Sequence, residues 1–314
     1  MSIINRAYKT SILTLIFIGL NACGLINDDL DSCAQKISIQ FYEKDECTDI
    51  TYFDKLNDVV LLAFDDQSNI IYEEHFKELN LNNEHAYEFD LPLGVHQYFV
   101  WSGVDAHYIQ SQVKQSDDLF FALKCKNNIL EGEELKPLYS GGNILSQTKS
   151  LPTEVQNIQH LSVNLKERTN RMNVVLELDK SDSSIDINNF EVIIKSSNGA
   201  MYLNGQLPVA QDLITYFPEV EGGRTSSKSK FYLLELKEEQ QNELIIRNKV
   251  DGSIIYKADL LHDLLLKNEA IKLNCLNDFQ LKFILSEQQA TAQTYSVINI
   301  SVNDWIVYSH DVDL

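Results

Sequence analysis

Hydrophobic and polar residues alternate along most of the chain with the period of two that is typical of β-strands. An early example is KISIQFYE, in which Ile37, Ile39 and Phe41 alternate with polar residues. Residues 59–66 begin with a continuous apolar run, and a second strand pattern follows the polar turn at residues 67–69. These two segments predict a β-hairpin.

The segment HAYEFDLPLGVHQYFVWSG predicts a second pair of strands, because Pro92 and Gly94 mark a turn between two alternating stretches. Further strands are predicted in LFFALKC and at residues 161–165. The pattern restarts at Arg171, and the strand candidates that follow are MNVVLELD, FEVIIKSSNG, FYLLEL, NELIIRN, IIYKADL and the closing YSVINISVNDWIVYS. Only residues 258–268 have the spacing of a helix.

Many short strands with few helices predict an all-β fold built from β-sandwiches. Because the pattern restarts, we expect two of them in tandem. The polar stretch KERTNR is the predicted boundary. It gives an N-terminal β-sandwich at residues 34–167 and a C-terminal β-sandwich at residues 168–314.

The first 22 residues follow a different pattern. Arg6 and Lys9 precede a short apolar stretch at residues 11–20. A membrane span takes about 20 apolar residues, so this stretch fits the core of a signal peptide instead. Leu20-Asn21-Ala22-Cys23 then resembles a bacterial lipobox, although Asn21 departs from the usual small residue. The sequence predicts a lipoprotein signal peptide at residues 1–22 and lipid attachment at Cys23; the alternative is an ordinary secretion signal with a chance cysteine.

A lipidated Cys23 would carry two or three acyl chains. Each CH₂ group buried in the membrane contributes about 0.8 kcal/mol, so a single acyl chain binds only marginally. A second acyl chain makes the anchor stable. Residues 23–33 are predicted to form an acidic tether that contains Asp28, Asp29 and Asp31. These acids resemble the signals that send lipoproteins of the Bacteroidales lineage to the cell surface; a solvated tether explains them equally well.

The composition, with 44% hydrophobic and 23% charged residues, is that of a globular protein. The formal net charge of −20 argues against a nucleic-acid partner and against adsorption to anionic lipid, because like charges repel. Of the five cysteines, Cys33 and Cys47 flank one strand and are the candidate disulfide. Cys125 and Cys275 lie in apolar strand patterns, where buried thiols are expected.

No motif of a known catalytic or nucleotide-binding site is present. The seven histidines are scattered, and Asp105 with His107 lacks the nucleophile of a triad. Three acidic pairs, at residues 65–66, 117–118 and 133–134, lack the spacing of a calcium loop and are interpreted as solvated turns. Trp101 ends an apolar strand and is expected in the core. We therefore predict no catalytic residues, no metal and no cofactor.

The order of these motifs resembles the fimbrial anchor-subunit lipoproteins of Bacteroidales-type fimbriae over nearly the whole chain. The matching segments are the lipobox at Cys23, the early Cys33, VVLLAFDDQSNIIYEE, LPLGVHQYFVWSG, PLYSGG, LKERTNRMNVVLEL, FEVIIKSSNGAMYLNG and INISVNDWIV. Leu91, Pro92, Gly94 and Trp101 match the family's turn and strand, whereas His96 replaces its tyrosine.

The resemblance implies two transthyretin-like β-sandwich domains and a structural role. The protein would lie at the base of a surface fimbrium, tethered to the outer membrane by lipid and joined to stalk subunits by strand addition. The alternatives are a polymerising stalk or tip subunit and a carbohydrate-binding surface lipoprotein.

The resemblance also implies that stalk subunits are cut by an Arg-specific protease near their first strand. This chain has no arginine between Cys23 and Glu167. We therefore expect its first strand, around residues 37–41, to stay in place.

Overall fold

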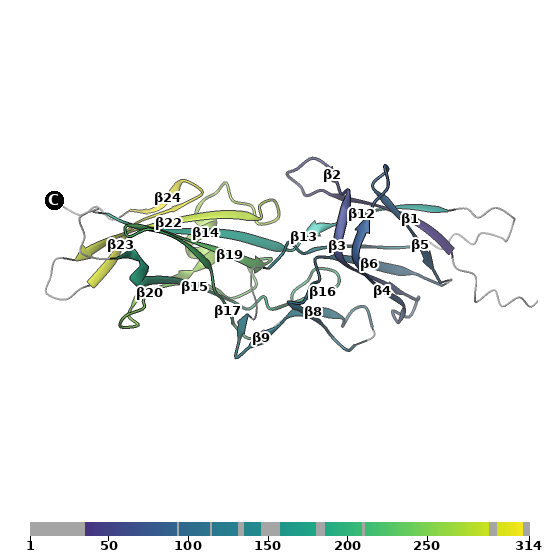
Figure 1. The fold of residues 1–314 in the computed structure, drawn as a ribbon, viewed down its shortest axis with the longest axis horizontal. Coiled ribbons are helices and arrows are strands. Elements are labelled where there is room, and N and C mark those ends of the chain that lie inside the picture. Colours follow the sequence, from purple (N-terminus) through teal and green to yellow (C-terminus); the bar gives the residue numbers. More distant parts are fainter. Residues whose placement is uncertain are drawn as a thin grey trace, which may run out of the picture.

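The computed structural model describes residues 35–92, 94–113, 115–130, 135–145, 158–179, 186–208, 211–288 and 294–309. The predicted signal peptide, the lipid site at Cys23 and Cys33 lie outside these ranges. The described chain is almost entirely β-structure, which confirms the predicted all-β class. Figure 1 shows an elongated molecule in which two sandwiches follow one another along the long axis.

The N-terminal sandwich contains two sheets. The β1 sheet consists of β12 (Gln159–Asn164), β1 (Gln35–Glu43), β5 (Ala86–Leu91) and β2 (Thr51–Tyr52). The β3 sheet consists of β13 (Lys166–Glu167), β11 (Tyr139–Ile144), β6 (Gln97–Ser102), β3 (Lys55–Phe64) and β4 (Ile70–Asn80). β1 lies between β5, which runs antiparallel to it, and β12, which runs parallel. The first strand of the described chain is therefore a central strand.

Apolar side chains fill the space between these two sheets. Ile37, Ile39 and Phe41 of β1 are completely buried and pack with Leu61 of β3. The alternation seen in KISIQFYE thus places one face of β1 in the core, as a half-buried strand requires.

The predicted hairpin at residues 59–76 is confirmed as β3 and β4, which pair antiparallel. The continuous apolar run of β3 has a structural cause, because both of its faces are buried. Leu61 belongs to the core shared with β1. Leu62 belongs to a second core on the opposite face, which includes Trp101 and Phe121. The Trp101 and Phe121 rings lie 4.9 Å apart.

The strands predicted on either side of Gly94 exist as β5 and β6, but they do not form a pair with each other. β5 pairs with β1, whereas β6 lies between β3 and β11 in the other sheet. The turn therefore carries the chain across the sandwich. The pattern of apolar residues could not reveal this, because a hairpin and a crossing between sheets both join two half-buried strands through a Pro and Gly turn.

Gly94 adopts a φ of +90°, with open space where a side chain would begin. A β-branched residue adopts this conformation poorly, so Gly94→Val is expected to lower the free energy of unfolding by about 1–3 kcal/mol. Gly223 also has open space around its Cα but no positive φ, so Gly223→Val is the matched control. Denaturant unfolding measures both variants. Equal stabilities of the two variants would contradict the conformational requirement at Gly94.

A segment between β6 and β11 extends from the first half of the chain onto the second. β7 (Tyr108–Gln110) and β8 (Phe120–Leu123) form a small sheet with β16 (Ala200–Tyr202). The hairpin of β9 (Cys125–Lys126) and β10 (Ile129–Leu130) joins β17 (Ile214–Tyr216). Figure 1 shows these strands together beneath the junction of the two sandwiches. The core behind Trp101 is consequently continuous with the core of the second sandwich.

The C-terminal sandwich also contains two sheets. The β15 sheet consists of β21 (Ile254–Asp259), β20 (Asn242–Asn248), β15 (Phe190–Ser196), β17, β10 and β9. The β14 sheet consists of β18 (Glu219–Gly222), β19 (Ser226–Leu234), β14 (Thr169–Leu178), β22 (Asp278–Gln288), β23 (Thr294–Val302) and β24 (Trp305–Ser309). β14 and β22 run parallel to each other.

The helical spacing of residues 258–268 corresponds to a short π-helix, η4 (Leu260–Leu264), followed by a 3₁₀ turn, η5 (Leu265–Lys267). Asp259 caps this segment by accepting from the backbone N–H groups of Leu261 and His262. Another 3₁₀ turn, η3 (Ile187–Asn189), precedes β15.

Candidate functional site at the junction of the two sandwiches

β1 runs from the outer end of the N-terminal sandwich toward the junction with the second sandwich. The strand begins at the end of the molecule farthest from the C-terminal sandwich (Figure 1). Its last residue, Glu43, lies near Glu167 and Arg171 at the junction. Burial raises the pKa of Glu43, and the nearby carboxylates of Glu167 and Asp45 raise it further. The first strand of the described chain therefore begins at the end of the sandwich opposite the junction.

The main chain crosses the junction as an almost continuous extended segment. β12 runs parallel to β1 and leads through β13 directly into β14. Arg168, between β13 and β14, donates its backbone N–H to Leu138 and accepts from the backbone N–H of Glu235. Both sandwiches thus hold the crossing residue by backbone hydrogen bonds.

A disulfide between Cys47 and Cys275 forms a second covalent connection across the junction. The two Cα atoms are 5.5 Å apart, and the cysteines are separated by 228 positions in the sequence. Beside it, the side-chain amide of Asn274 donates to the carboxylate of Glu46 over 2.7 Å. Cys47 follows β1 and Cys275 precedes β22, so the bond joins the two sandwiches.

This bond corrects the sequence prediction. The expected pairing of Cys33 with Cys47 is wrong in this structure, because Cys47 is bonded to Cys275. The expectation of a buried thiol at Cys275 is wrong for the same reason, whereas Cys125 is half-buried. Proximity in the sequence favoured Cys33, but the fold brings together two segments that no local pattern connects.

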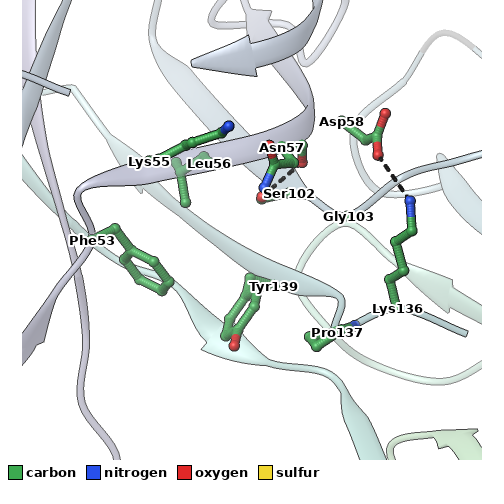
Figure 2. Close-up of a pocket in the computed structure, with 10 residues that line it drawn as sticks. All are labelled: Phe53, Lys55, Leu56, Asn57, Asp58, Ser102, Gly103, Lys136, Pro137 and Tyr139. Carbon is green, nitrogen blue, oxygen red and sulfur yellow. Dashed lines mark hydrogen bonds and ion pairs between the residues drawn. The ribbon is translucent and has the colours of Figure 1, made fainter. Parts of the chain in front are cut away.

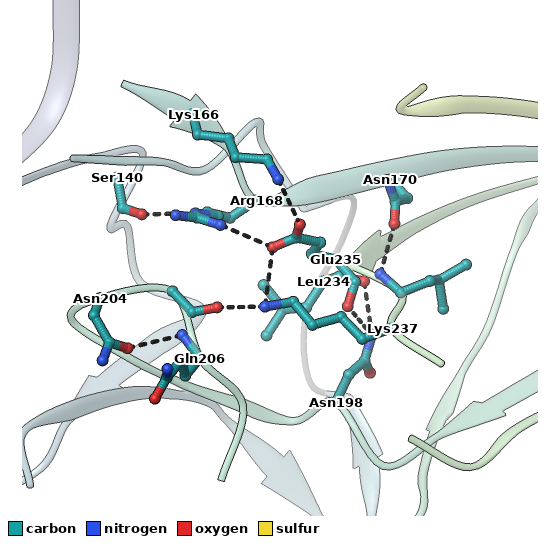
Figure 3. A network of polar contacts seen from close by, with 12 residues as sticks. Ser140, Lys166, Arg168, Asn170, Asn198, Asn204, Gln206, Leu234, Glu235 and Lys237 are labelled. Atoms are coloured by element: carbon teal, nitrogen blue, oxygen red, sulfur yellow. Dashed lines mark hydrogen bonds and ion pairs between the residues drawn. The ribbon is translucent and has the colours of Figure 1, made fainter. Parts of the chain in front are cut away.

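A buried carboxylate, Glu235, organises one side of the junction (Figure 3). Only 6% of this residue is exposed, and three cations surround it. Arg168 Nη1 and Lys166 Nζ each lie 3.1 Å from its carboxylate oxygens, and Lys237 Nζ lies 3.6 Å away. Burial alone raises the pKa of Glu235, but Arg168, Lys237 and Lys166 together outweigh burial and hold it below its ordinary value. Glu235 is therefore a charged, paired group at neutral pH.

Arg168 also links Glu235 to the N-terminal sandwich, because its Nε donates to the hydroxyl of Ser140 in β11 over 2.8 Å. The guanidinium lies against Gly205, where a Cβ atom would approach it to 2.4 Å. Gly205 therefore leaves room for Arg168. The network spans both sandwiches.

A second polar network lies nearer the disulfide. Glu167, which is 5% exposed, accepts from Thr169 over 2.9 Å, from Arg171 over 2.5 Å and from Asn277 over 3.1 Å. Arg171 also donates to Asp278, the first residue of β22, over 2.6 Å. The Asp278 hydrogen bond, opposed in part by burial, raises the pKa of Arg171. These contacts connect the crossing chain to the start of β22.

A small pocket of about 210 Å³ lies beside the junction (Figure 2). Phe53 and Tyr139, whose ring centroids are 5.3 Å apart, contribute much of its apolar lining. Lys136 Nζ lies 3.9 Å from an oxygen of Asp58 at its rim. Pockets for small-molecule ligands are usually larger, at roughly 300–1,000 Å³. We assign no ligand to this pocket.

Other candidate side chains from the sequence have local structural roles. Asp105 accepts from both the backbone N–H and Nδ1 of His107, at 2.9 and 2.8 Å, within one turn. Asp65 accepts from two backbone N–H groups in the β3–β4 turn, which agrees with its interpretation as a turn residue. Trp101 is completely buried, as expected. The third acidic pair, residues 133–134, lies outside the described residues.

Among the described residues, one group of possible metal ligands is close enough to share an ion, namely Asp45, Cys47 and Cys275. Its two sulfur atoms are joined in the disulfide. None of the helices in the described ranges is long and apolar enough to cross a membrane.

The C-terminal hairpin provides an exposed edge at the other sandwich. β23 pairs with β22, and β24 pairs with β23 at the edge of the β14 sheet. Trp305 is 62% exposed, and Ile306 and Tyr308 are also exposed. An edge strand presents unpaired backbone groups to which another chain can add a strand.

Comparisons with known proteins agree with this architecture. The chain is 26% identical over 310 residues to the minor fimbrium anchoring subunit Mfa2 of Porphyromonas gingivalis, covering 94% of this chain and 93% of that protein. The structure of the fimbrial anchor protein Mfa2 from that organism matches with a TM-score of 0.74 and 24% identity, over 88% of this chain and all of that one.

Other solved structures share the same fold. A candidate polysaccharide-binding protein of Bacteroides thetaiotaomicron matches with a TM-score of 0.68 and 17% identity, over 89% of this chain and all of that one. A candidate adhesin of Bacteroides ovatus matches with a TM-score of 0.69 and 16% identity, over 89% of this chain and 97% of that one. A family model matches residues 30–311, and the chain therefore belongs to the family of fimbrillin-A associated anchor proteins Mfa1 and Mfa2.

Proposed function

We propose that this protein is the anchor subunit at the base of a cell-surface fimbrium, held to the outer membrane by lipid on Cys23. In this proposal residues 1–22 are removed as a signal peptide and residues 23–33 form the tether. Family membership supports the fimbrial role. The observation that carries the anchoring role is the position of β1, which is a fully paired central strand that begins close after Cys23.

A retained β1 explains why the polymer would end at this subunit. Strand addition requires a sheet with an open position for the incoming strand. The space that a missing β1 would leave between β5 and β12 is filled by β1 itself. Because no arginine lies between Cys23 and Glu167, an Arg-specific protease has no site at which to remove this strand.

The polarity of the molecule supports the same function. β1 begins at the outer end of the N-terminal sandwich (Figure 1). A lipid tether attached there would leave the C-terminal sandwich pointing away from the membrane. β23 and β24 complete the β14 sheet at its edge. We propose that the exposed edge of β24 contacts the neighbouring fimbrial subunit.

Removal of the lipid site tests the proposal. Cys23→Ala is expected to shift the protein from the membrane fraction to the soluble fraction, because the acyl chains are its proposed attachment to the membrane. The unfolding transition should be unchanged, since both sandwiches begin beyond Cys23. Cys125→Ala, which leaves the tether intact, is the control and should stay with the membrane. A Cys23→Ala protein that remains in the membrane pellet, in cells that lack other fimbrial subunits, would contradict the lipid anchor.

A further inference from the structure

We propose that the Cys47–Cys275 disulfide is a force-bearing connection, which carries tension from the tether into the C-terminal sandwich without loading the chain between the two cysteines. The direction of the load rests on the proposed anchoring function.

The two covalent crossings of the junction connect two pairs of neighbouring parallel strands. In the N-terminal sandwich β1 and β12 are paired in parallel, and in the C-terminal sandwich β22 and β14 are paired in parallel. The main chain leads from β12 to β14. The disulfide leads from the end of β1 to the start of β22. The junction is therefore spanned by two adjacent covalent connections.

A pull on the tether would reach these strands in a defined order. Tension enters β1 at Gln35 and acts along the strand toward the junction, because the far end of β1 points there. From Cys47 it passes through the disulfide to Cys275 and then into β22. β22 pairs with β23, which pairs with β24 at the exposed edge. Residues between the two cysteines lie in a closed covalent loop outside this path.

Noncovalent contacts beside the bond would not replace it. The hydrogen bonds that cross the junction from Asn274 to Glu46 and from Asn277 to Glu167 measure 2.7 and 3.1 Å. Each such contact is far weaker than a covalent bond. Under sustained tension they would break one at a time, whereas the disulfide keeps Cys47 and Cys275 together.

Single-molecule stretching of the mature chain, with one handle at residue 23 in place of the lipid and one at Leu314, tests this path. The 228-position separation of the cysteines corresponds to roughly 3.3–3.6 Å per extended residue, so the oxidised chain should reach a final length about 800 Å shorter than the reduced chain. The double variant Cys47→Ser/Cys275→Ser should match the reduced wild type. Equal final lengths for oxidised and reduced wild-type protein would overturn the proposal.

The functional consequence is tested on cells. Shearing should release severalfold more fimbriae from cells that carry Cys47→Ser/Cys275→Ser than from wild-type cells, with the uncleaved, acylated variant chain left in the membrane. Unchanged release from the double variant would overturn the force-bearing role. This result is distinct from failure of the lipid anchor, which Cys23→Ala reports separately, and the stretching experiment does not depend on acylation.

Discussion

Replacing Glu235 by alanine is expected to lower the free energy of unfolding by about 3–5 kcal/mol, because removal of one partner leaves buried cations without a counter-charge. Arg168, whose side chain is 13% exposed, would keep its hydrogen bond to Ser140 but lose the carboxylate. The positive charges of Lys166 and Lys237 would remain beside Arg168 without the carboxylate that neutralises them. Denaturant unfolding at neutral pH measures the effect.

The matched control is Glu177→Ala, which removes a carboxylate from an exposed ion pair in the same sandwich. Glu177 lies 2.8 Å from Lys282, and both side chains are more than one-third exposed. Such a pair contributes about 0–1 kcal/mol. Equal losses of stability in the two variants would contradict the role of Glu235 as the counter-charge of buried cations.

The effect of Glu235→Ala should also depend on pH. The pKa of Glu235 is held below its ordinary value in the folded protein, despite the opposing effect of burial. Its contribution to stability is thus fully present above the ordinary glutamate pKa of about 4.3 and is lost as the pH falls through the lowered value. The stability difference between wild type and variant should shrink in acid. A difference that stays constant down to pH 3 would exclude an ionised Glu235 as its cause.

Replacing Ile39 by alanine should lower the free energy of unfolding by about 2–5 kcal/mol, because it leaves a cavity in a close-packed core. Ile39 is completely buried in β1 and packs between the two sheets of the N-terminal sandwich. Lys36→Ala, at an exposed position of the same strand, is the control and should change stability by less than about 0.5 kcal/mol. If Ile39→Ala had no larger effect than the control, β1 would not be an integral strand of the folded protein.

Most individual strands could be predicted from sequence, because a half-buried strand leaves a period of two in its own residues. KISIQFYE and the β3–β4 hairpin are examples. The sheet to which a strand belongs could not be predicted in the same way. β5 and β6 follow one another in sequence but lie in different sheets, and β1 pairs in parallel with the distant β12. Their alternation is compatible with either arrangement.

The contacts at the junction could not be predicted from the sequence, because they join residues that are far apart in the chain. Glu235 lies between Leu234 and Leu236, and no local signal connects it with Lys166 and Arg168. The disulfide joins cysteines separated by 228 positions, whereas proximity favoured Cys33. The absence of arginine before Glu167, in contrast, could be read from the sequence alone. Together with the central position of β1, this absence of arginine indicates that the first strand is retained.

An anchor subunit of this kind keeps β1 in the mature protein and carries lipid on Cys23. Mass spectrometry of the protein isolated from assembled fimbriae tests both parts at once. We expect acylated Cys23 and Leu314 to lie in one uncleaved chain. A mature N-terminus beyond Phe41, with β1 removed, would rule out the anchoring role and indicate a polymerising stalk subunit.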